Sequence, residues 1–90
     1  MKNKLTLEDI QSVIVKAEYH RLTDKLTTCV LTLQNGYTVT GESACIDATN
    51  YVQEIGEKIA YENAMNKVWQ LEGYLLQQKI FEARQGGTMT

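Results

Sequence analysis

Apolar and polar residues alternate on both sides of an Asn-Gly pair in the middle of the chain. The stretch from Cys29 to Cys45 reads CVLTLQNGYTVTGESAC, and both of its halves are rich in residues that favour β-strands. An Asn-Gly pair between two such runs is a strong sequence signal for a hairpin closed by a two-residue turn. We therefore predict a β-hairpin with Asn35-Gly36 at its tip.

A two-residue turn also predicts which strand residues face one another. It pairs Leu33 with Thr38 and Leu31 with Thr40, so that apolar and polar side chains are mixed on both faces of the hairpin. The C-terminal helices can cover one half-apolar face. We expect a second copy of the chain to cover the other, because a small domain gains most from additional burial.

The residues before the hairpin predict a short helix followed by a strand. Thr6 precedes Glu8 and Asp9, an arrangement typical of a helix N-terminus. Between Val13 and Leu22 alternate residues are apolar and β-branched residues are frequent, which favours a strand. A continuation of the first helix to Leu22 is the alternative.

Helical periodicity dominates from Val52 onward, where apolar residues recur at spacings of three and four. Glycine is unfavourable inside a helix, so Gly73 predicts a break between Trp69 and Gly73. The break gives two C-terminal helices, and one kinked helix is the alternative. Residues 85–90 are predicted to form a flexible tail.

These elements predict an α+β fold. We expect residues 1–90 to form one domain, in which a small antiparallel β-meander is packed against a short N-terminal helix and two C-terminal helices. Gly56, Ala60 and Ala64 recur every four residues and place a stripe of small side chains on one helix face. Such a stripe favours close packing of another backbone, with the floor of a ligand site as the alternative.

The composition narrows the functional classes. The 90 residues are 43% hydrophobic and 22% charged, which is ordinary for a globular domain, and the net charge is −2. Lys and Arg are not clustered, which argues against binding of duplex nucleic acid. The sequence has no apolar run typical of a signal peptide or of a membrane-spanning helix, so no membrane contact is expected.

The sequence gives little support for catalysis. Ser43 does not lie in a nucleophile motif, and His20 is the only histidine. A pair formed by His20 with Cys29 or Cys45 is possible within one sheet, although buried thiols are the simpler interpretation. One histidine and two cysteines are too few for a structural zinc site. We therefore expect a protein without enzymatic activity, metal, cofactor or disulfide.

Several side chains are suited to binding a nucleotide, which requires base stacking, amide hydrogen bonds and cations for phosphates. Asn63 and Asn66 are poor helix formers within a predicted helix, which suggests a specific hydrogen-bonding role. Core packing is the alternative for the aromatic residues, and a solvated helix face for the cations. The candidate binding residues are Tyr51, Trp69, Asn63, Asn66, Lys58, Lys67, Arg84, Glu42 and Ser43.

Two blocks together resemble a known family. They are the hairpin stretch and the segment Glu54 to Leu76, which reads EIGEKIAYENAMNKVWQLEGYLL. In this order and spacing they are similar to small tailed-phage proteins named after gene products of N-four-like and Sf-six-like podoviruses, over roughly residues 12 to 82. Members often carry Pro where Gln70 stands. The resemblance implies a phage protein that acts in the host cytoplasm.

Small non-virion phage proteins commonly act on host machinery, and several unrelated ones are oligomeric sponges for cyclic nucleotide signals of antiviral defence. By this analogy we expect a homo-oligomer, a dimer or higher, that sequesters a cyclic nucleotide or a cyclic ADP-ribose-type signal at a subunit interface. The alternative is a phage inhibitor or adaptor that binds a host protein directly. The same half-apolar surfaces would serve either function.

Overall fold

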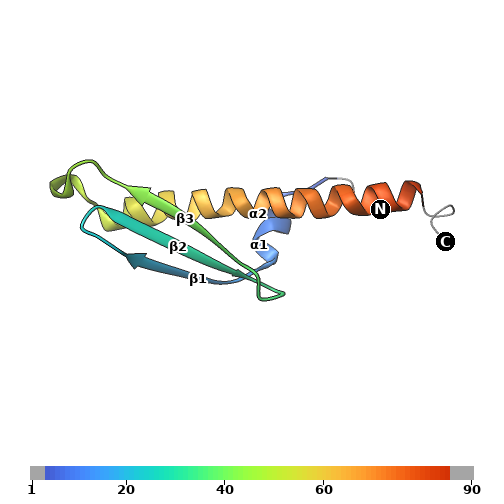
Figure 1. Ribbon diagram of the computed structural model, residues 1–90, viewed down its shortest axis with the longest axis horizontal. Helices are drawn as coiled ribbons and strands as arrows, with labels where there is room; N and C mark the ends of the chain where they lie inside the picture. Colours follow the sequence, from blue (N-terminus) through green and yellow to red (C-terminus); the bar gives the residue numbers. More distant parts are fainter. Residues whose placement is uncertain (1–3, 86–90) are drawn as a thin grey trace.

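A three-stranded antiparallel sheet packs against one long helix in the computed structural model, which describes residues 4–85 (Figure 1). The predicted α+β fold and β-meander are confirmed. The alternative helix through Leu22 is wrong, because this segment forms the first strand. The elements in chain order are α1 (Leu7–Ser12), β1 (Ile14–Arg21), β2 (Leu26–Leu33), β3 (Thr38–Ala44), the 3-10 turn η1 (Ala48–Asn50) and α2 (Gln53–Arg84).

The short helix α1 begins where the sequence predicts. The hydroxyl of Thr6 accepts a hydrogen bond from the backbone N–H of Asp9 at 3.2 Å, and the Asp9 carboxylate accepts one from the N–H of Thr6 at 2.9 Å. This reciprocal capping box satisfies N–H groups that have no partner within the helix. Ile10 anchors α1 in the core, where its side chain is fully buried.

The hairpin turn differs from the prediction by one residue. The N–H of Leu33 donates to the carbonyl of Tyr37 at 2.8 Å, so the loop has three residues and ends at Gly36, whose φ is +90°. A turn followed by a glycine in the left-handed region is the usual geometry of three-residue hairpin loops. Leu31 consequently faces Val39 rather than Thr40.

This shift separates apolar from polar side chains, because a slip of one residue moves a strand's side chains to the opposite face. Leu31, Leu33 and Val39 are all buried on the side of the sheet that faces α2. The opposite face carries Thr32 and Thr38 as a cross-strand pair. The prediction that both faces of the hairpin are half apolar is therefore wrong. The argument that a second chain covers the open face of the sheet rested on that prediction and is withdrawn.

The helix α2 is one continuous element of 32 residues, about 48 Å long. The prediction of two C-terminal helices is therefore not confirmed and is corrected to one helix. A single glycine costs only about 1 kcal/mol relative to alanine in a helix, which is too little to interrupt so long an element. The predicted tail lies outside the described residues except for Gln85, which caps α2.

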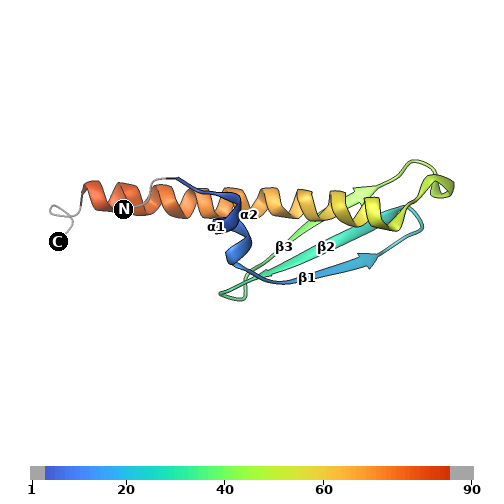
Figure 2. The same ribbon diagram turned by 180° about the vertical axis from the view of Figure 1, so that it is seen from behind.

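The sheet covers only the N-terminal half of α2, and the C-terminal half projects beyond it (Figures 1 and 2). Both views show α1 beside the middle of α2, consistent with the contacts between these two helices. The molecule therefore measures 61 × 20 × 19 Å. We refer to residues 69–84 as the projecting half of α2.

The stripe of small residues is used for close packing within the chain. A Cβ placed on Gly41 of β3 would lie less than 3.0 Å from the backbone of Ala60 and Ala64. The backbones of β3 and α2 thus approach each other as closely as glycine and alanine allow. Of the two interpretations of the stripe, close packing is confirmed.

Replacing Gly73 by alanine is expected to stabilise the protein. No atom lies within 4 Å of the position that a Cβ would take on Gly73, so the added methyl group has room. Alanine removes a helix penalty of about 1 kcal/mol. Urea unfolding should show a gain close to this value, whereas a loss would indicate that α2 bends at Gly73 in solution.

Candidate functional site

The predicted binding residues do not converge on one place in the single chain. Tyr51 lies just before α2, and Arg84 is the last residue of this helix. Lys58 and Arg84 are separated by roughly 40 Å along α2. One group of the candidates, however, is brought together where α2 passes the edge of the sheet.

This group is organised by a hydrogen bond between a helix side chain and a strand. The amide nitrogen of Asn63 donates to the backbone carbonyl of Glu42 at 2.7 Å. β3 is an edge strand, and the Glu42 carbonyl has this side-chain partner in place of a further strand. Asn66 and Lys67 follow Asn63 by three and four positions and share its side of α2.

We call Glu42, Asn63, Asn66 and Lys67 the amide face. All four residues are exposed in the single chain. The face offers amide donors and acceptors from two asparagines and one cation, a combination that can recognise the edge of a base and a nearby phosphate. The proximity of the strand to the two asparagines could not be deduced from the sequence, because it depends on the packing of Gly41 against α2.

Tyr51 and Ser43 belong to a different region. The Tyr51 hydroxyl shares a hydrogen bond of 2.5 Å with Thr27 and also donates to Gln53. The guanidinium of Arg21 lies over the Tyr51 ring, 3.9 Å from its centroid. One face of this ring is thus already occupied. Ser43 and Tyr51 line a cavity of about 110 Å³, which is smaller than typical ligand sites.

The remaining candidates lie apart from the amide face. Trp69 is partly buried and packs against the core, so core packing is confirmed for this residue. Lys58 and Arg84 are exposed at distant points of α2. The three predicted cations are thus spread along the helix and do not form a phosphate site within one chain.

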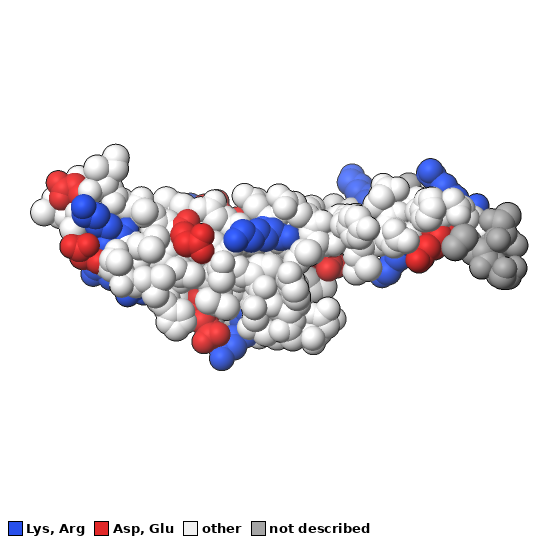
Figure 3. Space-filling model, viewed as in Figure 1, with Lys and Arg blue, Asp and Glu red and all other residues white. Residues whose placement is uncertain are grey.

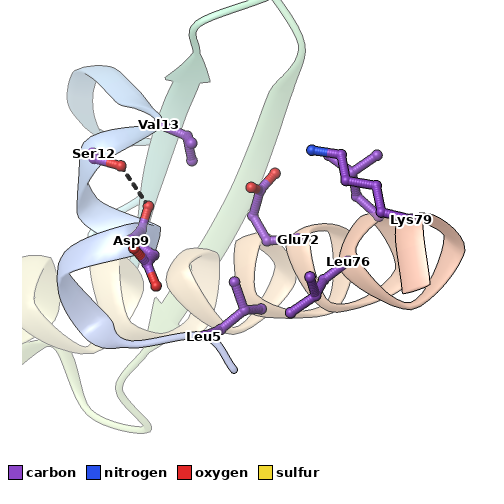
Figure 4. A pocket seen from close by; sticks show the side chains of 8 residues that line it. Leu5, Asp9, Ser12, Val13, Glu72, Leu76 and Lys79 are labelled. Carbon is purple, nitrogen blue, oxygen red and sulfur yellow. Dashed lines mark hydrogen bonds between the residues drawn. The ribbon is translucent and has the colours of Figure 1, made fainter. Parts of the chain in front are cut away.

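A groove that the sequence analysis missed lies where the projecting half of α2 passes α1 and the hairpin tip. Its largest cavity, of about 390 Å³, lies between α1 and α2, and Figure 4 shows Glu72 and Lys79 projecting from α2 toward it. Glu72 and Leu75 also line two adjoining cavities next to Asn35 at the hairpin tip. No local motif marks this groove, because residues from three distant segments form it.

The electrostatics of the sheet do not indicate an activated nucleophile. Burial raises the pKa of the Cys29 thiol above its usual value, and the hydrogen bond from Tyr19 only partly opposes this effect. Cys29 faces Gly41, and both Cys29 and Cys45 are free thiols. A thiol whose pKa is raised is mostly protonated at neutral pH and is a weak nucleophile.

Neither a cluster of metal ligands nor a membrane-spanning helix is found in the part of the chain that the structure describes. Within residues 4–85, no three His, Cys, Asp or Glu side chains are grouped as metal ligands. None of the helices formed by these residues has the length and apolar character needed to cross a membrane. Figure 3 shows Lys and Arg separated by Asp and Glu side chains on one face of the molecule.

Asn63 and Asn66 are expected to differ in their effect on stability. Replacement by alanine improves helix propensity equally at both positions, but only Asn63→Ala removes the hydrogen bond to Glu42. Since one such bond contributes about 1 kcal/mol, Asn63→Ala should be less stable than Asn66→Ala by about that amount. Equal midpoints in urea unfolding would contradict this role of Asn63.

Comparison with known proteins confirms the resemblance seen in the sequence. The profile of the phage protein (N4 Gp49/phage Sf6 gene 66) family matches residues 5–80. This range includes the hairpin, the amide face and most of α2. Searches of curated proteins and of solved structures find no match.

Proposed function

The chain belongs to this family of phage proteins, and from that premise we propose that it is a non-enzymatic protein that sequesters a small nucleotide signal in the host cytoplasm. The proposed ligand is a cyclic nucleotide or a cyclic ADP-ribose-type molecule, and the proposed role is counter-defence. The observation that supports this proposal best is the amide face at the edge of β3.

The Asn63–Glu42 hydrogen bond gives the amide face a defined geometry. It orients one amide and leaves the neighbouring Asn66 amide exposed beside it. An asparagine amide presents a donor and an acceptor side by side and can pair with the edge of a base. The bond from Asn63 thus positions the surface, and Asn66 is the residue assigned to direct ligand contact.

An aromatic residue that the sequence analysis did not select extends this face. Tyr74 follows Lys67 by seven positions, so both side chains lie on the same side of α2. Its side chain is 75% exposed, the highest value for an aromatic residue among those described. An exposed tyrosine ring on a rigid helix is suited to contact at an interface between subunits.

The distribution of cations supports a ligand site shared between subunits. A cyclic dinucleotide or a cyclic ADP-ribose carries two phosphate groups, whereas the amide face contains one cation, Lys67. The other candidate cations, Lys58 and Arg84, lie elsewhere on α2. A second copy of the chain would supply both the missing positive charge and a surface that encloses the ligand.

Calorimetry tests this proposal. We expect one or more members of a panel of cyclic nucleotides and cyclic ADP-ribose isomers to bind with micromolar affinity or better. Asn66→Ala should weaken this binding about tenfold, which corresponds to about 1.4 kcal/mol. Gln11→Ala removes an exposed amide from α1 and serves as the control, with unchanged affinity expected. Absence of heat with every compound would contradict the proposal.

Direct binding of a host protein is a second candidate function, favoured by a different surface. Leu22, Ile46 and Ile55 are 61%, 96% and 56% exposed at the end of the molecule where β1 ends and α2 begins. Exposed apolar side chains gathered in one region are typical of protein-binding surfaces. Ile46→Asp should abolish capture of a host protein and leave nucleotide binding unchanged if this candidate is correct.

A further inference from the structure

The side of α2 that packs on β3 continues beyond this contact toward the C-terminal end of the helix. Ala60 and Ala64 contact Gly41 of β3. Alternating steps of three and four residues extend the same stripe to five further positions, the second of which, Leu71, also lines the cavity beside the hairpin tip. This stripe, which we call the seam, consists of Lys67, Leu71, Tyr74, Gln78 and Phe81.

The seam has the character of a surface that packs against another helix. Leu71, Tyr74 and Phe81 are 38%, 75% and 46% exposed, and the adjacent Leu75 is 44% exposed. Apolar residues at alternating spacings of three and four form the contact line between paired helices. Contiguous apolar residues on a projecting helix are unusual for a protein that acts as a monomer.

We infer that the seam pairs with the same seam of a second copy of this chain, with the two helices antiparallel and Lys67 opposite the partner's Glu82. This register places Tyr74 opposite the partner's Leu75 and Leu71 opposite the partner's Gln78. A two-fold axis relates the two copies, so each contact occurs twice. The interface is an antiparallel pair of α2 helices.

The charges at the two ends of the seam favour a second copy of this chain as the partner, and they favour an antiparallel arrangement of the two α2 helices. A cation, Lys67, lies at one end of the seam, and Glu82 lies beside its other end. Neither side chain forms an ion pair within residues 4–85 of its own chain. Antiparallel pairing joins opposite charges at both ends, whereas a parallel two-fold pair would place Lys67 against Lys67.

The shape of the molecule also favours the antiparallel arrangement. The strands of the sheet lie against the N-terminal half of α2 and do not extend along most of the projecting half, as Figure 2 shows from behind. Antiparallel helices place the two sheets at opposite ends of the pair. A parallel arrangement would place both sheets at the same end.

The same register completes the amide face. It brings the partner's Arg84 to the level of Met65 and Asn66, on the same side of the helix pair as Asn66. Arg84 and Asn66 lie eighteen residues apart, or five helical turns, and therefore share one side of α2. The interface thus places a cation of the partner subunit beside Asn66, where the proposed function, on which this step rests, needs positive charge, but the interface can be tested without a ligand.

Sedimentation equilibrium of the ligand-free protein tests this inference. The wild-type chain should form a dimer. Lys67→Glu and Glu82→Lys should each raise the dissociation constant about tenfold, since each change replaces two attractive contacts by two repulsive ones. The double variant restores opposite charges in exchanged positions, and it should dimerise as well as the wild type.

The matched controls are Lys58→Glu and Glu62→Lys, which make the same charge changes at exposed positions of α2 outside the seam. Both should dimerise normally, and circular dichroism should show that all variants retain the fold. A monomeric wild-type chain, single variants that dimerise normally, or a double variant weaker than either single variant would overturn the inference. Dimerisation is measured here without nucleotide. Failure of this inference can therefore be distinguished from failure of the proposed nucleotide binding, which calorimetry tests.

Discussion

Replacing Gly41 by valine is expected to lower the free energy of unfolding by about 3 kcal/mol or to prevent folding. Backbone atoms of Ala60 and Ala64 occupy the space that a Cβ would need, and backbone cannot move aside as a flexible side chain can. Overpacking of a well-packed core typically costs about 1–3 kcal/mol, and contact with backbone places this variant at the upper end. The total stability of a small domain is only about 5–15 kcal/mol.

Urea unfolding followed by circular dichroism measures this effect. Gly73→Ala is the matched control, since it also adds a side chain to a glycine but at an open position. Gly41→Ala should fall between Gly41→Val and the wild type. A Gly41→Val variant as stable as the wild type would mean that β3 and α2 do not approach each other as described.

Replacing Leu31 by alanine is expected to destabilise the protein by about 2–5 kcal/mol. Leu31 lies on the central strand between Ala17 of β1 and Val39 of β3, and its side chain is completely buried. The loss combines the transfer free energy of the removed groups with the cost of the cavity that remains. In a chain of 90 residues few other side chains can compensate.

The matched control for this variant is Leu22→Ala, which makes the same chemical change where the leucine is 61% exposed. Its stability should remain within about 0.5 kcal/mol of the wild type. If Leu31→Ala were equally mild, the apolar face of the sheet would not be the one that carries Leu31. The pair of variants therefore tests the strand register directly.

The pairing register of β2 with β3 could not be predicted from local sequence signals alone. Asn35 and Gly36 predict a hairpin correctly, yet the same two residues fit a two-residue turn and a three-residue turn with a left-handed glycine. The choice between them depends on which register places Leu31 and Val39 together against α2. That information lies in tertiary packing and not in the turn itself.

The continuity of α2 has a similar explanation. Gly73 lowers helix propensity locally, but helical residues on both sides maintain the hydrogen-bond ladder through it. The short helix α1 was predictable because its capping box, formed by Thr6 and Asp9, is entirely local. Local chemistry thus predicts where elements begin more reliably than it predicts where a long helix is interrupted.

The candidate site was only partly predictable. Asn63 and Asn66 were recognised because asparagine is unfavourable within a helix, and the structure gives Asn63 a specific partner, Glu42. Tyr51 and Trp69 were selected as possible stacking residues, but they are held by Arg21 and by the core. The exposed Tyr74 was missed because exposure of a helix residue depends on how far the sheet extends along α2.

Native mass spectrometry with the panel of cyclic nucleotides tests the central claim most directly, because it reports assembly and ligand in one spectrum. The account predicts a dimer or a larger even-numbered assembly that carries the nucleotide, with no ligand on the monomer. Substitution of Asn66 by alanine should lower the ligand-bound fraction, in line with a tenfold weaker affinity, but leave the assembly intact. A nucleotide bound to the monomer, or an assembly that binds none of the compounds, would contradict the account.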